Sequence, residues 1–136
     1  MIIRRKLHAG TKLKSDFFFL LQAPFAVNGY VGTDLDWTCF VTDDVNMIQF
    51  WVVDMNSPKN VSRIVHQSRF FVANSVQLRA GLDPDIFKNP VVATVTYGEN
   101  FEIQPYEFQP PILVRYIGIT GIDNSQFELC EVMAFE

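Results

Sequence analysis

Side chains that could carry out catalysis are few in this chain. His8 and His66 are the only histidines, and the sequence contains no G-x-S-x-G elbow, P-loop, dinucleotide-binding glycine motif or H-E-x-x-H. Neighbouring acids in one turn, such as Asp43 and Asp44, are not placed across a substrate cleft, as a glycosidase requires. The sequence therefore predicts a protein that is not an enzyme.

The two cysteines, Cys39 and Cys130, could form one covalent cross-link. They are too few for a four-thiolate zinc site or a disulfide scaffold, and they lie 91 positions apart. A bond between them would stabilise the fold by roughly 4 to 5 kcal/mol in the chain-entropy model, and it would require an oxidising compartment. Two buried thiols are the alternative, and the residues alone leave both open.

A carboxylate near the C-terminus interrupts an apolar pattern. If residues 127–135 form one strand, alternation places Glu131 on the same face as Phe127, Leu129, Met133 and Phe135. An ionised carboxylate on a buried face needs a cation or hydrogen-bond donors, so we expect Glu131 to have such a partner. The alternative is a bulge that slips the register and leaves Glu131 in solvent.

Composition and charge limit the class of protein. The chain has 136 residues, of which 49% are hydrophobic and 19% charged, which is typical of one folded domain over residues 1–136. The net charge is −4, but the first 14 residues hold five basic side chains and no acid, so the rest carries −9. A body this acidic excludes a phosphate-neutralising nucleic-acid interface and an anionic membrane surface as the main partner.

Short runs of β-branched and aromatic residues between turn residues predict strands. These runs cover residues 50–55, 61–67, 75–80, 91–97, 112–119 and 127–135. No window shows a sustained helical stripe of apolar residues, and prolines 58, 84, 90, 105, 110 and 111 fall between the runs. The pattern predicts an all-β sandwich.

The basic start precedes an apolar run over residues 17–23, which superficially resembles a secretion signal. The run is short, Asp16 adjoins it and no A-x-A cleavage site follows. No apolar stretch approaches the roughly 20 residues that span a bilayer. We therefore expect this run to open the domain.

Six segments, in this order, resemble the discoidin, or coagulation factor 5/8 type C, domains, and the fucolectins among them most closely. They are AVNGYVGTDL (26–35), TCFVTD (38–43), FWVVDM (50–55), VSRIVHQSR (61–69), VQLRAG (76–81) and the pair RYIGITG (115–121) and LCEVMAF (129–135). The resemblance covers about residues 7–136. It implies a jelly-roll β-sandwich of the galactose-binding-domain type, secreted and non-catalytic, whose end loops bind a glycan or glycoprotein.

The resemblance also implies a disulfide and a structural calcium ion. The bonded cysteines of the fucolectins correspond to Cys39 and Cys130. The calcium ligands correspond to the side chains of Asn28 and Glu131 and to the backbone carbonyls of Phe25, Tyr30, Thr38 and Cys130. Asn28 replaces an aspartate of the family, which weakens a site whose affinity follows ligand charge. A hydrogen-bonded Asn-Gly turn without an ion is the alternative at Asn28.

Sugar recognition in the fucolectins uses one histidine and two arginines, whose directional donors suit neutral hydroxyls. Of these three only Arg69 is retained, since Val41 takes the histidine position and the loop after Arg69 is shorter and lacks the second arginine. His66 precedes Arg69 by three residues and is a weaker candidate, with a structural role as its alternative. We expect fucose- or galactose-type binding to be rebuilt around Arg69.

The shortened loop carries Phe70 and Phe71 instead. An exposed pair of rings would contact a protein or a membrane surface, which gives a second hypothesis: an interaction module that keeps the scaffold and has lost the sugar site. The alternative is that both rings extend the core.

Overall fold

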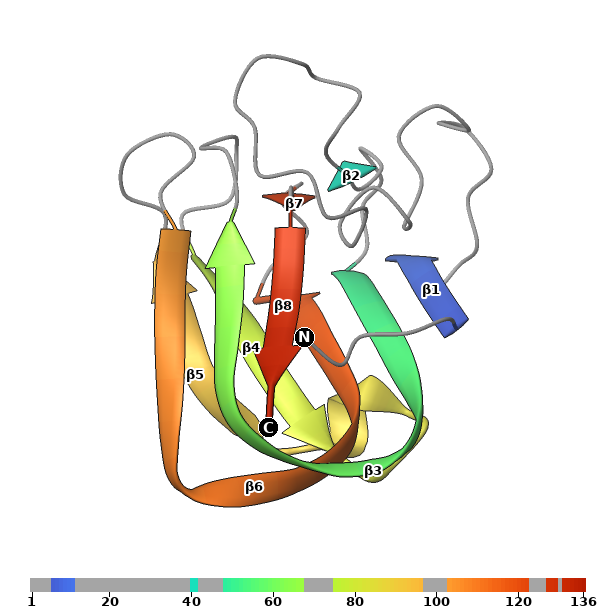
Figure 1. The fold of residues 1–136 in the computed structure, drawn as a ribbon. Coiled ribbons are helices and arrows are strands. Elements are labelled where there is room, and N and C mark those ends of the chain that lie inside the picture. The colour runs from blue at the N-terminus through green and yellow to red at the C-terminus, as the bar shows by residue number, and fades with distance from the viewer. Residues whose placement is uncertain are drawn as a thin grey trace.

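The computed structural model describes residues 6–11, 40–41, 48–67, 75–96, 103–122, 127–129 and 131–136. This part of the chain is almost entirely strand (Figure 1). The elements are β1 (Lys6–Thr11), β2 (Phe40–Val41), β3 (Gln49–Gln67), β4 (Ser75–Gly81), a short 3-10 helix η3 (Ile86–Lys88), β5 (Val91–Thr96), β6 (Ile103–Gly121), β7 (Glu128–Leu129) and β8 (Glu131–Phe135). None of the helical residues in these ranges forms a helix long and apolar enough to cross a membrane.

Two long antiparallel strands, β3 and β6, run through both layers of the sandwich. The first half of β3 and the second half of β6 belong to a layer with the order β1-β3-β6-β4-β5. The second half of β3 lies between the first half of β6 and β8 in the facing layer. Figure 1 shows β3 and β6 turning together at the lower end, where one layer passes into the other. The predicted all-β sandwich is confirmed.

The pairing of β3 with β6 is irregular at this turn. The register shifts between Asp54 and Lys59 and again between Val61 and Arg63 of β3. Asn56 has a positive φ of 72°, a conformation that asparagine tolerates better than most residues, and its backbone N–H donates to the Asp54 carboxylate at 2.8 Å. The bend therefore coincides with a break in the ladder and is held by a side chain.

Prolines were expected between strands, and that expectation is wrong for Pro58, Pro105, Pro110 and Pro111, which lie inside β3 and β6. Pro58 falls in the first register shift, and the Pro110–Pro111 pair falls in the second, so neither site needs a ladder hydrogen bond. Pro105 lies on the half of β6 that, among the described residues, pairs only with β3. These prolines interrupt the sequence pattern without ending the strands.

The predicted strands are otherwise recovered, with different boundaries. Residues 50–55 and 61–67 are the two halves of β3, 75–80 and 91–97 correspond to β4 and β5, and 112–119 is the second half of β6. The first half of β6 was not predicted, because its prolines and its alternation of exposed and half-buried residues hide the apolar pattern.

The segment 127–135 divides into two strands. β7 pairs with β2, whereas β8 pairs with β3. The core contains Phe127 and Leu129 before the division and Val132 and Ala134 after it, so the buried face changes from odd to even positions. The predicted single strand is wrong, and the register slip that was its alternative is confirmed.

The core lies between the two layers. It is built from Trp51, Val53, Met55, Val61, Ile64, Val76, Leu78, Ala80, Val114, Ile117, Ile119, Phe127, Leu129, Val132 and Ala134. Because β3 contributes from both of its halves, and Tyr106 and Phe108 of the first half of β6 pack against this cluster, the two long strands tie the two inner faces together.

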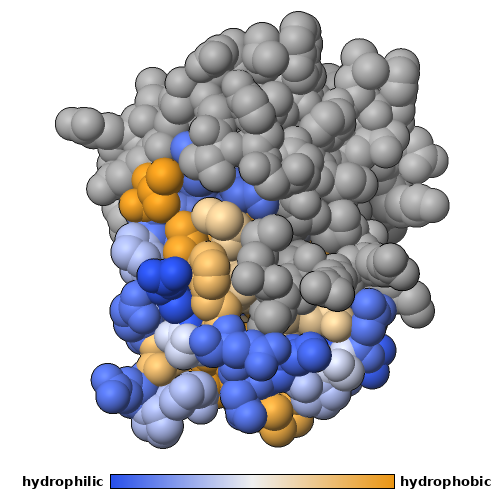
Figure 2. Space-filling model, in the orientation of Figure 1, coloured by the Kyte–Doolittle hydropathy of each residue, from blue (hydrophilic) through white to orange (hydrophobic). Residues whose placement is uncertain are grey.

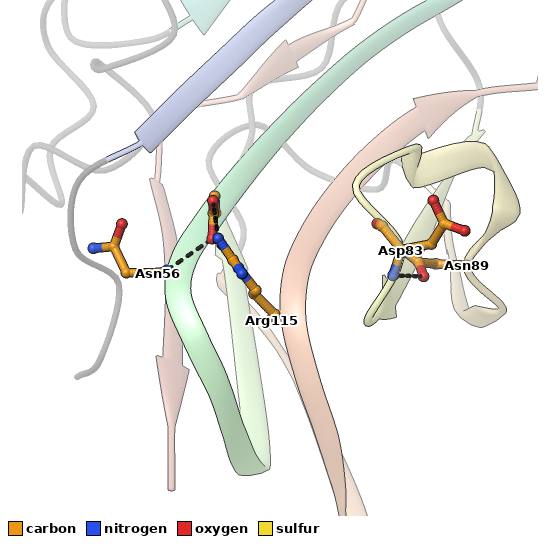
Figure 3. A network of polar contacts seen from close by, with 5 residues as sticks. Asn56, Asp83, Asn89 and Arg115 are labelled. Atoms are coloured by element: carbon orange, nitrogen blue, oxygen red, sulfur yellow. Dashed lines mark hydrogen bonds and ion pairs between the residues drawn. The ribbon is translucent and has the colours of Figure 1, made fainter.

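The segment between β4 and β5 covers part of the outer face of the larger layer. Ile86 is buried against Gly118 of β6, and the rings of Phe87 and Phe50 meet edge to face at 5.7 Å. Figure 3 shows Asp83 and Asn89 closing this segment: the backbone N–H of Asp83 donates to Asn89 Oδ1 and Asn89 Nδ2 donates to the Asp83 carbonyl, both at 2.9 Å. The segment is thus fixed to the sheet by apolar contact and by its own hydrogen bonds.

Candidate functional site

Buried polar side chains gather at one end of the sandwich. Gln49 is the first residue of β3, Gln67 is its last and Glu131 is the first of β8, and all three are buried. His66 and Thr120 lie one residue from the ends of β3 and β6 and have no exposed surface. These strand ends lie at the upper side of Figure 1, opposite the bend. Burying polar groups is costly unless they are partnered, so apolar packing alone does not explain the choice of residues at this end of the sandwich.

Glu131 pairs with Gln67 across the β8–β3 ladder. Val132 and Ala134 face the core, so alternation turns Glu131 to the outer side of its layer. Its exposed fraction is nevertheless 0%, and that of Gln67 is 3%. The register slip is present, but the expectation that it leaves Glu131 in solvent is wrong. The carboxylate of Glu131 is enclosed beside the buried side-chain amide of Gln67.

His66 faces the opposite way, into the sandwich. It lies between Gln104 of β6 and Val132 of β8 in register, on the face that Ile64 gives to the core. Its exposed fraction is 0%, and neither ring nitrogen has a hydrogen-bond partner among the residues the structure describes. Burial lowers the pKa of His66 from 6.5 to about 4, because an apolar interior disfavours the imidazolium. The side chain is therefore neutral at pH 7 and enclosed, which favours its structural interpretation.

The structure does not bring His66 and Glu131 into one site, because their side chains leave adjacent strands on opposite faces. In the described ranges, no three His, Cys, Asp or Glu side chains group as metal ligands. Several predicted site residues lie outside these ranges: Phe25, Asn28, Tyr30, Thr38, Cys39, Arg69, Phe70, Phe71 and Cys130.

Described residues adjoin several of these positions. Arg69 follows the end of β3 at Gln67 by two residues. Phe40 and Leu129, the sequence neighbours of the two cysteines, are direct partners in the antiparallel β2–β7 ladder. The strands therefore lead into the predicted loop residues from the same end of the sandwich that holds the buried polar side chains.

Sequence reasoning missed Gln49, which was detectable by the signal that singled out Glu131. Gln49 alternates with Trp51, Val53 and Met55, all of which face the core. In β3 the polar residue in an apolar row does mark a buried polar position. Thr120 gave no such signal. Its partner is Arg79 of β4, whose Nε donates to Thr120 Oγ1 at 3.1 Å, and only the pairing of β4 with β6 brings the two residues together.

Comparisons with known proteins agree on the scaffold. The F5/8 type C domain matches residues 11–135. A fucolectin from striped bass (Morone saxatilis) serum superposes with a TM-score of 0.80 and 20% identity over 95% of this chain. A chitosan-binding module of a Paenibacillus chitosanase/glucanase gives 0.73 and 17% over 99%, and a fucose-binding module of Streptococcus pneumoniae gives 0.73 and 12% over 99%.

The extent of these matches differs. The chain spans 45% of the striped bass lectin, 97% of the chitosan-binding module and 96% of the fucose-binding module. None of the curated protein sequences matches it. At these identities the superpositions establish the β-sandwich, while what the chain binds has to be argued from its own residues.

Proposed function

The chain belongs to the F5/8 type C domain family, and on that basis we propose that it is a non-catalytic module that binds a carbohydrate through the loop-bearing end of its sandwich. The observation that carries the proposal is the concentration of buried polar side chains, Gln49, His66, Gln67, Thr120 and Glu131, at this one end. The three structural neighbours named above are binding modules by name, and two of them bind fucose or chitosan, which supports a sugar as the ligand class.

Arg69 is the residue on which this proposal depends most. A guanidinium offers several donors in a fixed plane and can bind a pair of neutral hydroxyls without an opposite charge. The burial of His66 argues against a direct contact between its imidazole and a sugar. Its role in the proposal is to help pack the end of β3 from which Arg69 extends.

A structural calcium ion is part of the proposal. Calcium takes six to eight oxygen ligands and readily accepts backbone carbonyls, and the buried carboxylate of Glu131 is a donor of the right chemistry. The residues that would hold the ion are Phe25, Asn28, Tyr30, Thr38, Cys130 and Glu131. The bound ion would compensate the buried negative charge and fix the loops at this end, leaving Arg69 to contact the sugar.

We also propose that Cys39 and Cys130 form a disulfide and that the protein acts outside the cell. The support is the pairing of their sequence neighbours, Phe40 and Leu129, in one antiparallel ladder. Directly opposed residues in such a ladder have Cβ atoms about 4.5 to 5.5 Å apart, close to the spacing of a disulfide. A disulfide persists in an oxidising, extracellular compartment.

A glycan array tests the carbohydrate site. The wild-type protein should bind a subset of fucose-, galactose- or glucosamine-containing glycans, and Arg69→Ala should lose at least tenfold in affinity. Arg69→Lys should also bind poorly, because lysine keeps the charge but lacks the planar fork. Lys88→Ala, at an exposed position in η3, is the control and should bind as wild type.

Failure on the array would overturn the proposal. If no glycan binds at millimolar concentration, the scaffold is better explained by protein or membrane-surface interaction through Phe70 and Phe71. Binding of Phe70→Ser/Phe71→Ser to the same partners as wild type would then count against that explanation as well.

A further inference from the structure

We propose that the outer face of the β6–β3–β8 layer is a second carbohydrate-binding surface, centred on Arg63. It shares its ligand class with the proposed function but uses none of the same residues. The face comes entirely from described strands, and no family motif discussed above includes Arg63 among its sugar-contacting residues.

Register places the outward-facing side chains of this layer in rows. The row nearest the bend holds Glu107, Arg63 and Phe135, because Arg63 pairs with Glu107 on one side and with Phe135 on the other. The next row holds Pro105, Val65 and Met133. Figure 2, which views the molecule from this side, shows hydrophobic atoms running beside hydrophilic ones over β3 and β6. The face thus joins a charged row to an apolar one.

Arg63 is held in place but keeps its donors available. Its guanidinium lies over the Phe135 ring, with Cζ 4.3 Å from the ring centroid, and the Ser62 hydroxyl donates to the Phe135 carbonyl at 3.4 Å. In the described part of the chain, the guanidinium of Arg63 makes neither a hydrogen bond nor an ion pair. Stacking on an aromatic ring orients a guanidinium without using its N–H groups, so Arg63 presents a fixed set of donors.

Glu107 supplies acceptors beside these donors. It is exposed and lies directly across the ladder from Arg63, yet within the described ranges the two side chains form no salt bridge. A sugar hydroxyl both donates and accepts hydrogen bonds. Two adjacent hydroxyls can therefore accept from Arg63 and donate to Glu107 at the same time, which neither a simple anion nor a simple cation can do.

The apolar row suits the carbon-bound hydrogens of a sugar ring. Pro105 is exposed and Met133 is half-buried, whereas Val65 between them is buried at 7% exposed, so the apolar contact of this row comes from Pro105 and Met133. Exposed Ile103, one row further along β6, adds apolar surface beside Pro105. Two rows of residues along a strand lie about 7 Å apart, so one sugar residue can contact the charged row and the apolar row together. The neighbouring carboxylate of Glu107 and the acidic body of the protein disfavour polyanionic ligands.

Heteronuclear NMR titration with chitotriose, methyl α-L-fucoside and methyl β-D-galactoside tests this surface. Amide signals of residues 63–66, 104, 106, 107 and 132–135 should shift with at least one of these probes at millimolar concentration. Arg63→Met keeps an apolar stem over Phe135 and removes the donors, so it should weaken these shifts at least tenfold in affinity. Lys88→Met, which removes one positive charge elsewhere, should not change them.

The two sites fail independently. Arg69→Ala should leave the shifts on the β6–β3–β8 face intact, and this result supports a separate surface. Shifts confined to the residues around Arg69 would overturn the second site and leave the proposed function standing. If the ligand-induced shifts of amide signals on the β6–β3–β8 face persist unchanged in Arg63→Met, the role of Arg63 is overturned. A loss of those shifts in Arg63→Lys as well would support recognition by the planar fork rather than by charge alone.

Discussion

The guanidinium of Arg115 binds the carboxylate of Asp54 through two parallel hydrogen bonds, Nε to Oδ1 at 2.8 Å and Nη2 to Oδ2 at 3.0 Å. Asp54 Oδ1 also accepts from the backbone N–H of Asn56 at 2.8 Å, as Figure 3 shows from close by. Asp54 is buried, whereas the Arg115 side chain is 36% exposed. The hydrogen bond to Asp54 is the main reason that the pKa of Arg115 is raised. The pair joins β3 to β6 where both strands bend.

We expect Arg115→Met to destabilise the protein more than the double variant Asp54→Asn/Arg115→Met. The single change leaves a buried carboxylate without its cation, which is the costly arrangement, whereas the double change removes the charge as well. Urea unfolding of both variants measures the difference. Equal stability of the two variants would mean that solvent near the exposed Arg115 screens the charge of Asp54.

Acidification should destabilise the protein through His66. The unfolded chain takes up a proton near pH 6.5 and the folded one only near pH 4, so the unfolded state binds more protons between these values and stability falls as pH falls through this window. A shift of this size corresponds to roughly 3 kcal/mol at the acid end. The urea midpoint of the wild type, followed from pH 7 to 4.5, measures the loss.

His66→Gln is the matched control for this titration. It removes the titrating group, so its unfolding free energy should vary less with pH over the same range, even if its stability at pH 7 is lower. A wild-type slope that His66→Gln reproduces would assign the pH dependence to carboxylates instead.

Gly118 should not tolerate alanine. An added Cβ would overlap Ile86 Cγ1 and lie 2.9 Å from the Trp51 carbonyl oxygen, and overpacking of this kind costs about 1 to 3 kcal/mol. Ile86→Ala removes one of the two obstacles, so Gly118→Ala/Ile86→Ala should be less destabilised than the sum of the single changes. Strict additivity in thermal unfolding would contradict the proposed contact.

Sequence patterns predicted the strands well where alternation was undisturbed, as in β4 and both halves of β3. They could not reveal that β3 and β6 continue through the bend, because Pro58, Pro110 and Pro111 look like strand breakers unless the register shifts are known. The same limit applies to residues 127–135, where the local pattern cannot show that β7 and β8 pair with different strands.

The candidate site was predictable in part. Glu131 was expected to be buried on the face of Phe127 and Leu129. It is buried, but on the outer side of its layer, because the core-facing positions change from odd to even between β7 and β8. The opposite orientations of Glu131 and His66 depend on the pairing of β8 with β3, which the sequence does not contain. The surface around Arg63 was equally hidden, since Glu107 and Phe135 become its neighbours only through long-range pairing.

Calcium removal should lower the melting temperature. An ion bound only by the native state at 100 times its Kd adds roughly 2.7 kcal/mol, which corresponds to roughly 5 to 10 °C for a domain of this size. Differential scanning fluorimetry with calcium and with chelator measures the shift. The melting temperature of Glu131→Gln should change with neither calcium nor chelator. A wild-type melting temperature that chelator does not change would remove calcium from the proposal.

Reduction should destabilise the protein if Cys39 and Cys130 are bonded. The chain-entropy model credits a loop of this length with roughly 4 to 5 kcal/mol. Non-reducing peptide mapping by mass spectrometry should recover the two cysteines in one linked species, and reductant should lower the melting temperature. Cys39→Ser/Cys130→Ser should be indifferent to reductant. Detection of two free thiols after purification under oxidising conditions would contradict the bond.

Because β3 and β6 each pass through both layers, neither layer can move away from the other without breaking the strands they share. Amide protons on both sides of the bend should then exchange through the same cooperative opening. The Arg63 surface and the end of β3 that leads to Arg69 are in this way held by one strand. A polymeric glycan would then bind two surfaces that lie at a fixed distance from each other. Its avidity should depend on the length of the glycan, and should rise sharply once one molecule is long enough to bind both surfaces.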